Sequence, residues 1–112
     1  MRVTSPVILT AHMKEAIKDG AWIEVECIES AVARGNTHRG EWKIYVCAHL
    51  GGTINKAIYV SGRNLEPRIY KTVAGLQSFG MEMGLEKRIC IPIQEGEIEV
   101  WEFEESERKK PT

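Results

Sequence analysis

Basic and aromatic side chains are the residues of this 112-residue chain whose types and spacing could bind a ligand. Cations bind phosphate groups, and aromatic rings beside them can stack on bases. Arg63, Arg68 and Lys71 would also lie near the N-terminus of a predicted helix, where the helix dipole favours a phosphate. The predicted nucleic-acid-binding residues are Arg34, Arg39, Lys43, Tyr45, Lys56, Arg63, Arg68 and Lys71.

Charge is distributed unevenly along the sequence. The formal net charge is −1, yet residues 34–88 contain nine Lys and Arg against four Glu. Residues 95–107, in contrast, contain seven Glu and no Lys or Arg. A basic middle favours a polyanionic ligand, whereas dedicated nucleic-acid binders are usually basic overall. The leading hypothesis is therefore binding of DNA or RNA by the basic middle of the chain.

The last predicted strand, residues 98–103, suggests an alternative function. Ile98 and Val100 lie on one face of this strand, while Trp101 and Phe103 lie on the other. One face could cover the core and the other a partner, unless a bulge returns both to the core. The alternative is a homodimeric protein-interaction module, with Trp101, Phe103, Met81 and Met83 as predicted interface residues.

Patterns that indicate catalysis or metal binding are weak. Cys47 and His49 are the only thiol and imidazole close in sequence, and residues two apart on one strand face are neighbours by geometry alone. The cysteines and histidines lack the short spacings of zinc sites, and a single Asp argues against a calcium loop. We predict a non-catalytic protein without metal or cofactor. An enzyme built from Cys47, His49 and the C-terminal glutamates is the third alternative.

The cellular compartment is predicted from apolar runs and cysteines. No run reaches the roughly 18 apolar residues that a membrane span needs, and the N-terminal residues do not resemble a signal peptide. Cys27, Cys47 and Cys90 are odd in number, widely spaced and each within a predicted strand. We expect them to be buried free thiols, as in a reducing compartment. The prediction is a cytoplasmic protein without a membrane partner.

Hydrophobic periodicity predicts the elements that must position these residues. Period-two patterns predict strands over residues 21–33, 41–50, 56–61, 88–93 and 98–103. Helical spacing predicts a helix over 11–18, capped by Thr10, and a second that begins at Pro67 and ends at Gly84. In the strand over 41–50, Lys43 is expected to face Glu24 or Glu26 across an antiparallel pair. The core-facing row of that strand is predicted to be Trp42, Ile44, Val46, Ala48 and Leu50.

Short links between the strands predict an α+β fold. We expect a mostly antiparallel sheet of about five strands with two helices packed on it, in the order α-β-β-β-α-β-β. The length fits a single domain over residues 1–107, followed by a frayed charged tail over 108–112.

Overall fold

A computed structural model describes residues 7–62, 65–86 and 88–103. Within these residues six strands form one sheet in the order β1-β4-β3-β2-β6, with β5 paired to β3 outside this path. β1 is parallel to β4 and the other named pairs are antiparallel. The elements are β1 (Val7–Ile8), α1 (Thr10–Lys18), β2 (Trp22–Arg34), β3 (Thr37–Leu50), β4 (Thr53–Tyr59), β5 (Ile69–Thr72), α2 (Val73–Met83) and β6 (Ile98–Trp101).

The α+β class, the two helices and the mainly antiparallel sheet are confirmed, whereas the predicted strand count and order are not. Six strands replace the predicted five, because two short strands, β1 and β5, were not expected. The predicted strands over 21–33, 41–50, 56–61 and 98–103 correspond to β2, β3, β4 and β6 with shifted ends. The predicted strand over 88–93 is wrong.

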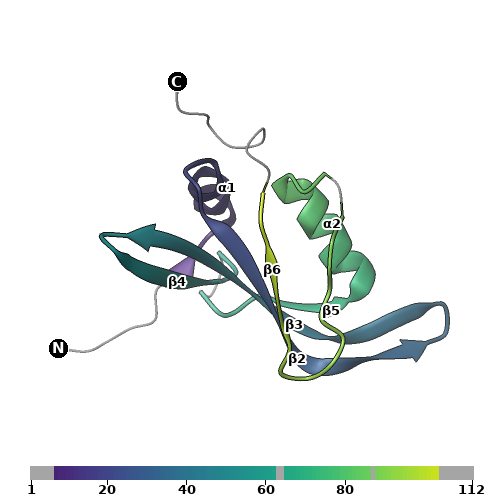
Figure 1. Cartoon of the computed structure of the whole chain (residues 1–112). Helices are drawn as coiled ribbons and strands as arrows, with labels where there is room; N and C mark the ends of the chain where they lie inside the picture. Colours follow the sequence, from purple (N-terminus) through teal and green to yellow (C-terminus); the bar gives the residue numbers. More distant parts are fainter. Residues whose placement is uncertain (1–6, 63–64, 87, 104–112) are drawn as a thin grey trace.

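β2 and β3 form the longest pair in the sheet, and only one face of this pair is covered by helices in the described part of the chain (Figure 1). On that face Ile23, Val25 and Ile44 are fully buried. Alternation places Glu24 and Glu26 on the opposite face, where Glu26 pairs with Lys43 as predicted. The period-two pattern of the sequence therefore predicts correctly which side of the pair is buried.

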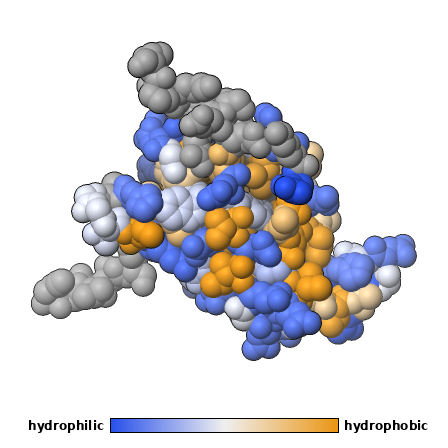
Figure 2. Space-filling view, in the orientation of Figure 1, coloured by the Kyte–Doolittle hydropathy of each residue, from blue (hydrophilic) through white to orange (hydrophobic). Residues whose placement is uncertain are grey.

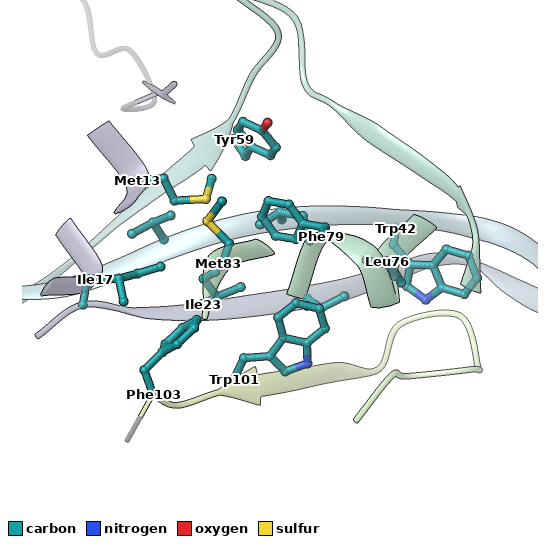
Figure 3. Close-up of a cluster of buried hydrophobic side chains, with 14 of the residues drawn as sticks. Met13, Ile17, Ile23, Trp42, Tyr59, Leu76, Phe79, Met83, Trp101 and Phe103 are labelled. Carbon is teal, nitrogen blue, oxygen red and sulfur yellow. The ribbon is translucent and has the colours of Figure 1, made fainter. Parts of the chain in front are cut away.

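Both helices contribute to the same core (Figure 3). α1 buries Met13 and Ile17, and α2 buries the apolar stripe along one of its sides. Phe79 of α2 is central, because its ring centroid lies 5.5 Å from Tyr59 and 6.3 Å from Trp101. Thr10 is the first residue of α1 and not its cap, since Leu9 holds the cap position and the Thr10 hydroxyl is hydrogen-bonded to the Tyr59 hydroxyl at 2.7 Å.

The second helix is shorter than predicted at its N-terminal end. Ile69–Thr72 form β5 and pair with β3, so the helix begins at Val73 and not at Pro67. The β-branched and aromatic residues of this stretch suit a strand, and pairing with β3 overrides the helical spacing. Thr72 becomes the cap by accepting a hydrogen bond from the Gly75 amide at 3.0 Å. The predicted end at Gly84 is confirmed by its left-handed φ of 114°.

Residues 88–93 cross the sheet as an irregular segment instead of joining it. The Trp101 indole donates to the Cys90 carbonyl at 2.7 Å, and the Trp42 indole donates to the Pro92 carbonyl at 2.7 Å. Pro92 has no amide hydrogen for a ladder. These two indoles therefore replace strand pairing. Cys90 is exposed, so its predicted burial is wrong, whereas Cys27 and Cys47 are buried as expected.

We expect Gly40→Ala to destabilise the fold. A Cβ at Gly40 would lie 2.7 Å from the Glu29 carbonyl oxygen and 3.0 Å from Cη2 of Trp42, and one of these contacts is with the backbone. Overpacking of this kind costs about 1–3 kcal/mol, which urea denaturation would measure. Gly62→Ala is the control, because its nearest atom, Cδ2 of Leu9, lies 3.9 Å away. Equal stabilities of the two variants would contradict the close approach of β2 and β3 at Gly40.

Candidate functional site

The structure divides the predicted nucleic-acid-binding residues among several places. Arg34, Arg39 and Lys71 line one common hollow. Their convergence was not visible in the sequence, because the three residues belong to β2, β3 and β5. The others lie elsewhere: Lys43, Tyr45 and Lys56 on the sheet face opposite the helices, Arg68 beside the ring of Tyr70, and Arg63 outside the described residues.

The hollow has a volume of about 540 Å³ and opens where β2, β3 and β5 meet. The β2–β3 register shifts on both sides of Glu29, and β5 reaches this end of the sheet because Thr72 pairs with Arg39. Lys71, next to Thr72, is thereby brought to the two arginines. Irregular pairing thus creates the hollow at a point where a regular ladder would continue.

The three cations of the hollow are not neutralised within the described chain. Glu29 and Glu41 line the same hollow and lie directly opposite each other across β2 and β3. Even so, none of the three cations forms a salt bridge with a described carboxylate, and the ion pair found among the described residues joins Lys56 to Glu24 elsewhere in the sheet. Guanidinium and ammonium groups without an internal acceptor keep their hydrogen-bond donors for an external anion.

The cations on the sheet face opposite the helices are in a different situation. Lys56 Nζ lies 2.9 Å from Glu24 Oε1 and 4.6 Å from the centroid of the Tyr45 ring. The Tyr45 hydroxyl donates to Glu26 Oε1 at 3.0 Å. Burial, together with this bond and the charges of both glutamates, raises the pKa of Tyr45 to about 12. Because Lys56 and Tyr45 already have partners within the chain, they are less available to a nucleic acid than the three cations of the hollow.

Cys47 and His49 do not form a catalytic pair. Cys47 is buried, and burial followed by the charge of Glu24 raises its pKa to about 11. A catalytic thiol requires the opposite shift, because the thiolate is the nucleophile. His49 instead has its ring centroid 5.3 Å from that of Trp22. Among the described residues, no three His, Cys, Asp or Glu side chains are grouped as a metal ion would need.

The predicted interface residues lie mostly inside the chain. Trp101, Phe103 and Met83 are only 2%, 4% and 6% exposed and belong to the core, whereas Met81 is 65% exposed. A partner could therefore reach Met81 alone without opening the core. The exposed apolar residues of β6 are on its other face. The sequence could have indicated which face is buried, because the larger aromatic rings gain more from burial.

The sheet face opposite the helices carries these exposed apolar residues. Ile98 and Val100 are both 47% exposed and lie beside Glu26 and Glu24 of β2. Figure 2 shows apolar side chains at the surface in the part of the molecule where Figure 1 places β6.

Neither described helix is long and apolar enough to cross a membrane.

Comparisons of this chain with protein families, curated proteins and solved structures give no match. A function for it must therefore come from the site, since a fold class alone does not specify one.

We expect the free energy of unfolding to decrease as the pH rises above 9.0. The pKa of Cys47 is raised from 9.0 to about 11, so between these values the folded protein keeps a proton that the unfolded chain releases. The contribution of Cys47 to the free energy of unfolding is therefore complete below pH 9.0 and is lost as the pH rises from 9.0 to about 11. Urea denaturation from about pH 8 to 11 would measure the slope.

Cys47→Ala should reduce this decrease without abolishing it, because Cys27, Tyr45 and Tyr70 also have raised pKa values. Cys90→Ala is the matched control, because Cys90 is exposed and should leave the slope unchanged. A slope that is the same for the wild type and Cys47→Ala would show that this thiol is not responsible.

Proposed function

We propose that this protein is a non-catalytic nucleic-acid-binding protein that uses the hollow lined by Arg34, Arg39 and Lys71. The observation that supports the proposal is the convergence of three cations, from three strands, without internal salt bridges. Cations held close together without partners repel one another, and an anion with several negative charges relieves that repulsion. A phosphate backbone supplies such charges at regular spacing.

The remaining groups of the hollow indicate how strong this binding should be. Glu29 and Glu41 lie opposite each other in the lining and oppose a phosphate. With three cations against two carboxylates, we expect moderate affinity that depends steeply on salt. The absence of an activated thiol at Cys47 favours binding without chemistry.

Association of two copies is a second candidate function, supported by the sheet face opposite the helices. This face exposes four large aliphatic side chains, Val7, Ile54, Ile98 and Val100. Its charges are balanced in number, because Lys56 pairs with Glu24 and Lys43 lies opposite Glu26, whose carboxylate also accepts a hydrogen bond from the Tyr45 hydroxyl. Paired charges cost less to bury than unpaired ones, and a neutral patch does not repel a second copy of itself. This replaces the interface predicted from Trp101 and Phe103.

Fluorescence anisotropy with labelled oligonucleotides tests the first proposal. If three phosphates are contacted, affinity should fall about 20-fold for a single strand, and about 40-fold for a duplex, between roughly 50 and 200 mM salt. Removing two cations, by Arg39→Gln with Lys71→Gln, should reduce this change to about threefold. Glu41→Gln should instead strengthen binding, because it removes a negative charge from the hollow.

Lys14→Gln with Lys18→Gln is the matched control for charge, since both lysines are exposed on α1. This variant should bind almost as the wild type does. An equal loss for the two double variants would show that the hollow is not the binding site. Absence of binding by the wild type at the lower salt would overturn the proposed function itself.

Sedimentation velocity over a range of concentrations tests the second candidate. The wild type should form dimers, and Ile98→Lys with Val100→Lys should shift it to monomers by placing charges on the apolar face. Met81→Lys should leave the dimer intact, because Met81 is exposed on α2, which packs on the other side of the sheet. A wild type that is monomeric throughout would rule out association.

A further inference from the structure

The end of the β2–β3 hairpin, residues 32–39, projects past the core as a two-stranded ribbon (Figure 1). Its side chains are exposed, except that Thr37 is partly buried. The Ala31 amide of β2 donates a hydrogen bond to the Ile93 carbonyl, just before the ribbon begins. On the other strand, β5 pairs with β3 only as far as Arg39. The ribbon pairs are Val32 with Arg39, Ala33 with His38 and Arg34 with Thr37.

The ribbon is narrow and carries its donors at two levels. Ala33, Gly35 and Thr37 are small, so the larger side chains of the ribbon are interrupted by short ones. Arg34 and Asn36 lie at the tip, where Gly35 takes the left-handed φ of 62° that closes the turn. Arg39 lies at the base of the ribbon and lines the hollow together with Lys71 and Arg34.

These dimensions match one form of nucleic acid. Three residue pairs at about 3.4 Å per residue give a projection of about 10 Å, and the two strands lie about 5 Å apart. The major groove of B-form DNA is roughly 12 Å wide and roughly 8.5 Å deep, and it admits a two-stranded ribbon. The major groove of A-form RNA is too deep and narrow for side chains to read, and a single strand has no groove.

We propose that the ligand is duplex DNA and that residues 32–39 enter its major groove. This inference rests on the proposed function and specifies its ligand. Asn36 at the tip contacts a base edge, where asparagine suits adenine. Arg34, Arg39 and Lys71, the cations of the hollow, contact the phosphates that border the groove, which sets the position of the ribbon.

Anisotropy at one salt concentration tests this proposal with four probes. They are a DNA duplex of about 20 base pairs, one of its single strands, the RNA duplex of the same sequence, and the DNA duplex with glucosylated 5-hydroxymethylcytosine. The sugar projects from cytosine C5 and fills the major groove without changing the phosphates. The plain DNA duplex should bind about tenfold or more tightly than each of the other three.

Asn36→Ala should weaken binding of the plain duplex about fivefold or more and leave single-strand binding nearly unchanged, because Asn36 does not line the hollow. Lys14→Ala on α1 is the control for loss of an exposed cation. Equal affinities for all four probes, still lowered by Arg39→Gln with Lys71→Gln, would overturn groove insertion while retaining the proposed function. Failure of every probe to bind would overturn both.

Discussion

Burial of only one face of the β2–β3 pair is the constraint on which the rest of the structure depends. Both helices and residues 88–93 pack on the face that holds Ile23, Val25 and Ile44. Because strand side chains alternate, a slip of one residue would exchange this row for Glu24 and Glu26. The register is therefore fixed by burial. It determines in turn which residues meet at the far end of the sheet, where the cationic hollow forms.

The same constraint separates two kinds of surface. In the middle of the sheet, regular pairing places Lys56 of β4 and Glu24 of β2 on the same face with β3 between them, and the two side chains form an ion pair. Near Glu29 the pairing is irregular, and cations from three strands converge without forming a salt bridge to the two glutamates that line the same hollow. A charge that has a neighbour of opposite sign in a regular ladder contributes to the sheet. A charge at an irregularity remains available to a ligand, which is why the hollow and not the face is the better binding surface.

The sequence predicts the parts of the fold that depend on local pattern and misses those that depend on distant contacts. The alternation of β2 and β3 and the glycine that ends α2 are local, and both were predicted correctly. Residues 69–72 satisfied a helical stripe as well as a strand, so only pairing with β3 decides between them. Residues 88–93 have the local pattern of a strand. The neighbouring sequence does not reveal that the indoles of Trp42 and Trp101 donate hydrogen bonds to carbonyls of this segment. For the site, residue types were informative, but the convergence of Arg39 with Lys71 required the register.

The two proposed surfaces are compatible because they share no residue. The ribbon and hollow lie at one end of the β2–β3 pair, while Ile98 and Val100 lie on the sheet face opposite the helices. A dimer formed through that face would carry two ribbons related by a two-fold axis. Each ribbon would then meet one half of a duplex, and the spacing of the two half-sites would be set by the distance between the ribbons. Two weak contacts joined in this way bind far more tightly than one, so a hollow of modest net charge would suffice in a dimer.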